Sequence, residues 1–163
     1  MLLISMTSKK VFTLIRSKAA CAIKDCYLLR FDGGSVPNPG TCGSGAVIYS
    51  PDGTKLWEVG RYMDYGTNNA AEYTGLEIGL LLCLREGYLN IKIEGDSKLV
   101  ISQVSGLWAV KSDGLRTNYE RVIRLLDKFN YVAARHIYRE FNGDADALTN
   151  ELQGTRCGFE RRV

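Results

Sequence analysis

Four acidic residues combine the type and the spacing that divalent cations need. Asp32 and Asp96 each follow a short apolar segment expected to form a strand, whereas Glu72 and Asp146 each lie near the start of an expected helix. Carboxylates gathered in this way can hold two divalent cations on the order of 3.5–4 Å apart beside a phosphodiester, where the cations activate a water molecule and stabilise the leaving oxygen. Mg²⁺ prefers oxygen ligands, and Mn²⁺ accepts the same set. The residues therefore indicate phosphodiester hydrolysis without a side-chain nucleophile.

The elements that must position these carboxylates follow the order of an α/β domain with a mixed sheet and helices on both faces. Apolar segments predict strands at residues 27–31, 43–50, 55–63, 91–95 and 132–138, and helical periodicity predicts helices at residues 68–86, 97–105, 113–128 and 143–153. Short turns between the first three strands predict an antiparallel meander, and the later strand–helix–strand order predicts parallel pairing. Because open sheets bind ligands near the carboxyl ends of strands, Asp32 and Asp96 are expected to lie there.

Four motifs occur in order and carry a resemblance to a known family. They are Asp-Gly-Gly-Ser-x-x-Asn-Pro-Gly at 32–40, Thr-Asn-Asn-x-x-Glu-Tyr at 67–73, Gly-Asp-Ser-Lys-Leu-Val at 95–100 and Asn-x-x-Ala-Asp-x-Leu at 142–148. Together they resemble type 1 ribonuclease H over residues 27–152. The segment Leu-Trp-Ala-Val-Lys at 107–111 is similar to the plant and archaeal-like branch, and the long basic insertion of some bacterial members is absent from residues 106–118.

The resemblance implies a five-stranded mixed sheet flanked by helices, and an endonuclease that hydrolyses the RNA strand of RNA–DNA hybrids with Mg²⁺. It implies that Asp32 bridges two cations, that Glu72 and Asp96 share one, and that Asp146 holds the other. It also implies a substrate-binding set: Gly33, Gly34, Ser35, Asn38, Gly40, Thr67, Asn68, Asn69, Ser97 and Lys98. Asparagine amides can hydrogen-bond 2′-hydroxyls, and glycines allow close approach of a backbone.

Structural alternatives exist for all four carboxylates. Asp32 opens Asp-Gly-Gly, a sequence that is common in turns. Glu72 stands three residues after Asn69, as in a capping box. Asp96 fits the cap of the following helix, although Ser97 can serve there instead. Asp144 competes with Asp146 for the fourth position, and is interpreted as a first-turn carboxylate that favours the helix dipole.

Two further residues have both a structural and a functional interpretation. His136 is the only histidine in the chain, and it is predicted to be a structural or edge residue of the strand at 132–138. Many type 1 enzymes carry instead a histidine on a mobile loop before the last aspartate. Trp108 fits either stacking on a sugar or filling the core, and the core is preferred.

The composition indicates one globular domain, and no apolar run approaches the roughly 20 residues of a membrane span. Five cysteines without paired metal spacing favour reduced thiols in an intracellular protein. With a single histidine, a zinc site of mixed ligands is not expected. We expect a monomer whose partner is nucleic acid and which has no membrane partner.

Residues 1–26 are interpreted as an N-terminal extension, 27–153 as the catalytic domain and 154–163 as a C-terminal tail. The extension has five basic residues and one acidic residue, a net charge of +4 that leaves −1 for the rest of a chain of +3. Its composition fits either a disordered start or an organellar transit segment. Two alternatives remain for the whole chain: the ribonuclease H domain of a retroelement polyprotein, and a catalytically weak module that only binds hybrids.

Overall fold

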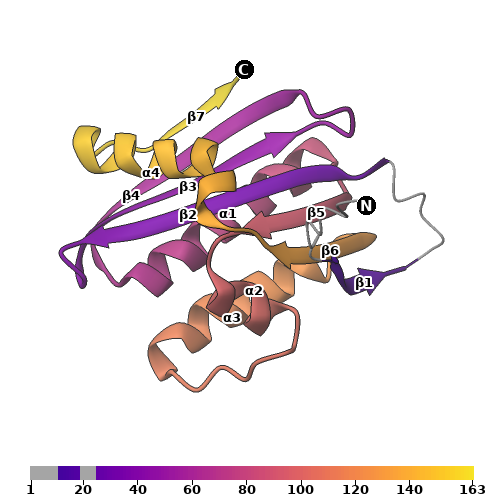
Figure 1. The fold of residues 1–163 in the computed structure, drawn as a ribbon, viewed down its shortest axis with the longest axis horizontal. Helices are drawn as coiled ribbons and strands as arrows, with labels where there is room; N and C mark the ends of the chain where they lie inside the picture. The colour runs from indigo at the N-terminus through magenta and orange to yellow at the C-terminus, as the bar shows by residue number, and fades with distance from the viewer. Residues whose placement is uncertain (1–10, 19–24) are drawn as a thin grey trace, which may run out of the picture.

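A computed structural model describes residues 11–18 and 25–163 of the chain (Figure 1). The predicted disordered or targeting segment therefore lies largely outside the described residues. The strands are β1 (Thr13–Ser17), β2 (Tyr27–Val36), β3 (Gly40–Tyr49), β4 (Lys55–Gly66), β5 (Asn90–Gly95), β6 (Tyr131–His136) and β7 (Phe159–Arg162). The helices are α1 (Asn68–Glu86), α2 (Lys98–Val104), α3 (Asp113–Leu126) and α4 (Gly143–Thr155), with a short 3₁₀ turn, η2 (Arg139–Phe141), before α4.

The strands form one mixed sheet in the order β1-β6-β5-β2-β3-β4-β7. Strands β2, β3 and β4 make the predicted antiparallel meander, and β5 pairs in parallel with both β2 and β6. Figure 1 shows α4 in front of the sheet, while α1 packs behind it and contacts α3. The predicted α/β class with helices on both faces is confirmed.

The sheet has seven strands among the described residues, so the expected count of five is wrong. Strand β1 pairs with β6, and β7 pairs with β4, both in antiparallel fashion. Each is a short edge strand held by backbone pairing and ion pairs rather than by an alternating apolar face. Arg161 of β7, for example, contacts Glu58 on β4 and Glu151 on α4. Apolar periodicity does not reveal strands of this kind.

Strand β2 is longer than predicted and continues through the Asp-Gly-Gly-Ser motif to Val36. Asp32 is therefore in the middle of the strand rather than at its end. The parallel neighbour β5 ends at Gly95, which is paired with Phe31. Asp32 lies one residue beyond that pair. From this point on, β2 has no pairing with β5.

Close packing of α1 against β2 places Glu72 beside Asp32. A Cβ added at Gly33 would lie 2.3 Å from the backbone of Ala71, and one added at Gly75 would lie 2.5 Å from the carbonyl oxygen of Asp32. Neither distance is possible for a real side chain, so both glycines are needed for this approach.

The main core lies between the sheet and the helices behind it, and includes the fully buried Phe31, Leu76 and Ile93. These side chains fix β2, α1 and β5, which are the elements that carry or precede three of the predicted carboxylates. Within the part of the chain that the structure describes, no helix is both long and apolar enough to cross a membrane.

Candidate metal and nucleic-acid site

Three of the four predicted carboxylates converge. Asp32 from the middle of β2, Glu72 from the first turns of α1 and Asp96 just after β5 each offer an oxygen, and these oxygens lie within 4.8 Å of one another. Residues 24 to 64 positions apart in the sequence thus meet at the carboxyl end of β5. A separation of this size suits carboxylate oxygens that share a divalent cation.

The environment of these carboxylates disfavours their negative charge. Burial, together with the charges of Asp96 and Asp146, raises the pKa of Asp32 to about 7, although a hydrogen bond from the backbone of Gly33 partly opposes the shift. Burial and the charges of Asp32 and Asp96 raise the pKa of Glu72 well above its ordinary value. Glu72 Oε2 is buried and has no hydrogen-bond donor among the described residues. A cation would relieve the repulsion and provide Oε2 with a partner, so the donor set fits a divalent metal.

The helix caps are made by other residues, which removes the structural alternatives for Glu72 and Asp96. Thr67, not Asn69, caps α1, and its hydroxyl accepts a hydrogen bond from the backbone of Ala70 at 3.2 Å. Ser97 caps α2 by accepting from the backbone of Val100 at 3.2 Å. Neither carboxylate is needed by its own helix.

Asp146 and Asp144 point to different surroundings from the first turn of α4. Asp146 lines the same cavity as the three convergent carboxylates, and its oxygens contact Arg139 at 3.2 Å and Asn150 at 3.5 Å. Asp144 instead accepts a hydrogen bond from the Tyr49 hydroxyl and pairs with Lys55 at 3.4 Å. The Tyr49 hydroxyl, more than Lys55, lowers the pKa of Asp144. Asp146 is the residue that faces the site.

Asn142 is a site residue that the sequence analysis did not single out. It is fully buried, and its Nδ2 donates to the carbonyl oxygen of Phe31 at 2.9 Å and lies 3.5 Å from Asp96 Oδ1. It therefore ties the start of α4 to both β2 and the Asp96 carboxylate. The sequence signal that could have identified Asn142 as a site residue is its place as the first residue of the fourth motif.

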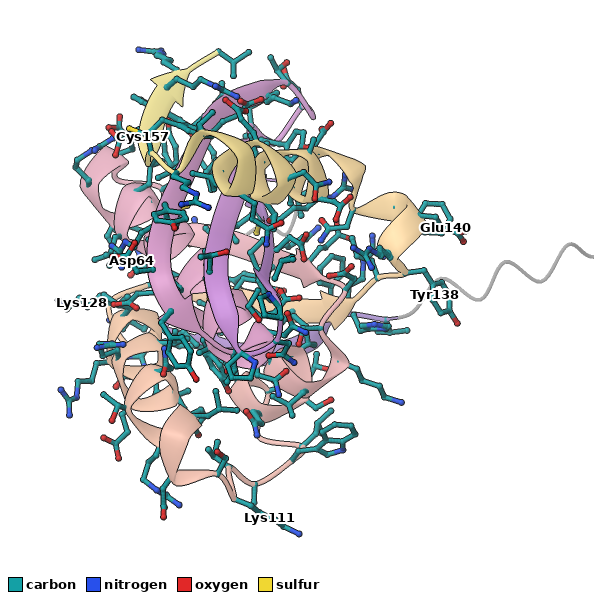
Figure 2. The ribbon with its side chains drawn as sticks, turned by 90° about the vertical axis from the view of Figure 1, so that its left-hand side faces the viewer. Asp64, Lys111, Lys128, Tyr138, Glu140 and Cys157 are labelled. Atoms are coloured by element: carbon teal, nitrogen blue, oxygen red, sulfur yellow. The ribbon has the colours of Figure 1, made fainter. Side chains whose placement is uncertain are left out.

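His136 lies nearer to the site than predicted. It belongs to β6, as expected, but it is the last residue of the strand and lines the cavity that holds the carboxylates. Its Nε2 lies 3.2 Å from the carbonyl oxygen of Asp96. Figure 2 shows Tyr138 and Glu140, from the segment that follows, projecting into solvent.

Two asparagines of the predicted substrate-binding set are joined in a hydrogen-bond network. Asn68 Oδ1 accepts from the backbone N–H of Ser35 at 2.8 Å, and Asn38 Oδ1 accepts from the backbone N–H of Asn68 at 3.0 Å. Because a backbone N–H can only donate, both acceptor atoms must be oxygens. Each Nδ2 is then the amide group that can donate to a ligand.

The other members of the substrate-binding set divide between two cavities and the surrounding backbone. Gly33, Gly34, Ser35 and Asn68 line the carboxylate cavity of about 590 Å³, whereas Asn38, Thr67 and Asn69 line a neighbouring cavity of about 840 Å³ that also includes Trp108. Lys98 is exposed, with its Nζ 5.9 Å from the Trp108 ring centroid. Ser97 caps its helix, as described above. Most of the set therefore lies along one continuous side of the molecule.

The structure gives the glycines a steric role and corrects the prediction for Trp108. A Cβ at Gly40 would lie 2.3 Å from the Pro37 carbonyl oxygen, so Gly40 is required by its own turn, just as Gly33 is required by α1. A Cβ at Gly34 would make only ordinary contacts, at 3.8–4.0 Å. The substrate-binding role of the three glycines stays a prediction. Trp108 is 48% exposed and lies outside the core, because residues 105–112 form an irregular surface connection between α2 and α3. Figure 2 shows Lys111 at the outer end of this connection.

Comparison with known proteins agrees with this geometry. Residues 30–152 match the family described as reverse transcriptase-like. Ribonuclease HI of Halobacterium salinarum is 39% identical over 121 residues, which cover 74% of this chain and 61% of that protein. The crystal structure of RNase H1 from the same archaeon has a TM-score of 0.77 at 36% identity, over 79% of this chain and 98% of the other. LC11-RNase H1, solved in complex with RNA/DNA hybrid, has a TM-score of 0.75 at 29% identity, over 80% and 99% of the two chains.

The mixed sheet and its convergent carboxylates define a ribonuclease H-like fold. The chain spans about three fifths of the length of the Halobacterium ribonuclease HI, but nearly all of the chain in the crystal structure from that organism. The chain belongs to the type 1 ribonuclease H family.

Proposed function

We propose that this chain hydrolyses the RNA strand of RNA–DNA hybrids with the help of Mg²⁺. The observation that carries the proposal is the meeting of Asp32, Glu72 and Asp96 within 4.8 Å, with one buried oxygen of Glu72 lacking a donor among the described residues. The similarity to Halobacterium ribonuclease HI, and to a ribonuclease H1 solved with an RNA/DNA hybrid, supports the same reaction and substrate.

Each carboxylate has a distinct part in the proposed reaction. Asp32 offers an oxygen within 4.8 Å of those of both Glu72 and Asp96, and the charges of Asp96 and Asp146 help to raise its pKa, which supports a role for Asp32 in holding both cations. Glu72 and Asp96 complete one side of the cluster, and Asp146 completes the other. Bound Mg²⁺ would supply Lewis acidity, lowering the pKa of an attacking water and stabilising the leaving oxygen.

The asparagine network gives the site a means of holding a nucleic-acid strand. With both Oδ1 atoms bonded to the protein, Asn38 and Asn68 present amide donors. Donors suit phosphate oxygens and the acceptor lone pairs of a 2′-hydroxyl, which is the group that distinguishes RNA from DNA. Gly34 has no side chain and lines the carboxylate cavity, which would allow a strand to approach the backbone of β2.

The proposal is tested by cleavage of matched duplexes of one sequence: RNA–DNA, RNA–RNA and DNA–DNA. Each is incubated with Mg²⁺, with Mn²⁺ and with EDTA. We expect cleavage of the RNA strand of the hybrid alone, leaving 5′-phosphate and 3′-hydroxyl ends, and no cleavage in EDTA. Binding of the hybrid without cleavage under every metal condition would instead make the chain a binding module.

A further inference from the structure

A second polar cluster lies on the front face of the sheet, in a row across three strands. Arg30 on β2 is paired in register with Glu94 on β5, and Glu94 is paired with Arg135 on β6. Glu94 is buried, with its side chain 2% exposed; one oxygen accepts from Arg30 Nε at 3.1 Å and the other from Arg135 Nε at 2.6 Å. The alternate residues of these strands, such as Phe31 and Ile93, face the core behind the sheet. The side chains of the row therefore lie on the front face of the sheet, opposite the main core.

No described helix covers this part of the front face. Helix α4 contacts β2, β3 and β4, and Figure 1 shows β5 and β6 beside it without a helix in front. A cleft of about 380 Å³ occurs here, a size that suits a small ligand. Besides the row, its wall includes Lys92, Phe12 and Tyr49, and the turn that contains Ser50 and Gly53.

Aromatic rings hold the cations of the cleft in place. The Arg135 guanidinium lies 4.3 Å from the Phe12 ring centroid, and Lys92 Nζ lies 5.3 Å from the same centroid. Arg30 lies 5.3 Å from the centroid of the Tyr49 ring. The two arginine side chains nevertheless remain 29% and 30% exposed, so their charges face the cleft as well as Glu94.

The cleft has more positive charge than its own structure requires. Arg30 and Arg135 share the single carboxylate of Glu94, and Lys92, which also lines the cleft, forms no ion pair among the described residues. Two acidic residues close in sequence or contact to its wall are engaged elsewhere: Asp144 pairs with Lys55 and Tyr49, and Asp52 accepts hydrogen bonds within its own turn.

We propose that this cleft binds a phosphate group, presented either by a free nucleotide or by a nucleic-acid strand. Guanidinium groups form paired, charge-assisted hydrogen bonds with phosphate oxygens, and a neighbouring ammonium adds a point charge. The cleft is separate from the candidate active site, because the two cavities share no lining residue.

The test follows backbone amide NMR signals of the full chain in metal-free buffer at constant ionic strength. The ligands are inorganic phosphate, adenosine 5′-monophosphate, and a single-stranded DNA oligonucleotide with and without a 5′-phosphate. Lys92→Met removes one charge but keeps the apolar stem beside Phe12. Lys128→Met is the matched control, since Lys128 is exposed but does not line the cleft. Figure 2 shows Lys128 on the opposite side of the molecule from Tyr138. The amide spectrum of each variant also reports whether its fold is retained.

We expect at least one phosphate ligand to bind with a dissociation constant below about 1 mM and to shift amides around Arg30, Lys92 and the turn at 50–53. Lys92→Met should weaken that binding by about tenfold or more, and Lys128→Met should leave it unchanged. Preference for the 5′-phosphorylated oligonucleotide or the mononucleotide identifies a terminal phosphate; equal binding of both oligonucleotides identifies the strand backbone. Shifts confined to other cavities, equal effects of the two lysine variants, or no binding below about 1 mM would overturn the proposal.

Discussion

One buried carboxylate, Glu94 on β5, lies two residues before Asp96, which belongs to the cluster of Asp32, Glu72 and Asp96, and the surroundings of the two sites differ. Glu94 has an arginine on each oxygen, so its charge is balanced by the protein. Asp32, Glu72 and Asp96 instead lie beside one another, and among the described residues no cation forms an ion pair with any of them. Arg139, the nearest paired cation, contacts Asp146. The difference indicates that Glu94 is balanced internally, whereas the Asp32 group needs a cation from outside.

The largest expected effect comes from Asp32→Asn. An amide cannot supply the charge that holds two cations, so the rate of hybrid cleavage should fall by several orders of magnitude, on the scale of losing a metal function. Circular dichroism should be unchanged, and the melting temperature in EDTA should equal or exceed that of wild type, because one repelling charge is gone. Retention of a tenth of the wild-type rate would exclude a bridging role.

The next prediction separates the two aspartates of α4 and uses initial rates at saturating Mg²⁺. Asp146→Asn should lower the rate by about a hundredfold or more, because a metal-binding group is lost. Asp144→Asn should change the rate little, since Asp144 contacts Tyr49 and Lys55 rather than the cavity. It should reduce stability by about 1 kcal/mol through the weakened contact with Tyr49. The opposite ranking of rates would move the fourth ligand to Asp144.

A pair of isosteric variants compares the two groups of carboxylates directly by urea unfolding in EDTA. Glu94→Gln leaves two arginines without a counter-charge and should destabilise the chain by about 2 kcal/mol, less than for a fully buried pair because both arginines are partly exposed. Glu72→Gln should stabilise the metal-free chain slightly, because burial and its neighbours already oppose the charge of Glu72. Equal destabilisation by both variants would remove the distinction between the groups.

The dependence of stability on pH should show the same distinction. The pKa of Asp32 is raised to about 7 in the folded chain from 3.8, so between these values the folded state holds a proton that the unfolded state has lost. The contribution of Asp32 to the free energy of unfolding therefore falls as pH rises from about 4 to 7, by roughly 2–4 kcal/mol. The check is unfolding of wild type and Asp32→Asn at pH 5 and pH 8 without metal. The free energy of unfolding of wild type, relative to that of the variant, should be lower at pH 8 than at pH 5. The same difference at both pH values would contradict the raised pKa.

The smallest effect is expected for His136→Ala. The histidine reaches the cavity, but its Nε2 contacts the backbone of Asp96, which suits a residue that positions the strand end. The rate should fall by less than about tenfold, whereas loss of a general acid or base costs ~10²–10⁴-fold. The pH–rate profile should keep its shape and the melting temperature should fall slightly. A loss above a hundredfold with an unchanged melting temperature would assign a proton-transfer role to His136.

The sequence was sufficient for features encoded locally. Asp32, Glu72 and Asp96 stand in recognisable motifs, and apolar periodicity located the meander, the parallel strands and α1. Features that depend on distant pairing were not predictable in this way. Edge strands β1 and β7 are short, and among their partly buried apolar residues only Ile15 and Phe159, respectively, pack against the core. The role of Gly33 depends on the approach of Ala71, and the row through Glu94 arises only when β2, β5 and β6 align.

Trp108 and Asn142 show, at the level of single residues, that local sequence does not reveal features that depend on the fold. An aromatic side chain is usually buried, but Trp108 lies on a surface connection whose path the local sequence does not determine. Asn142 reads as an ordinary turn residue until the fold brings Phe31 and Asp96 to it. The monomeric state and the intracellular location remain predictions.

The most direct test of the central claim is the melting temperature of wild type and Asp32→Asn as a function of Mg²⁺ concentration. If the Asp32 group needs an external cation, Mg²⁺ should stabilise wild type progressively, by about 2.7 kcal/mol once its concentration is a hundredfold above the dissociation constant. The melting temperature of Asp32→Asn should rise far less with Mg²⁺. That of Glu94→Gln should be lower than wild type without Mg²⁺ but should rise by the same amount when Mg²⁺ is added. Equal stabilisation of wild type and Asp32→Asn by Mg²⁺ would contradict the account.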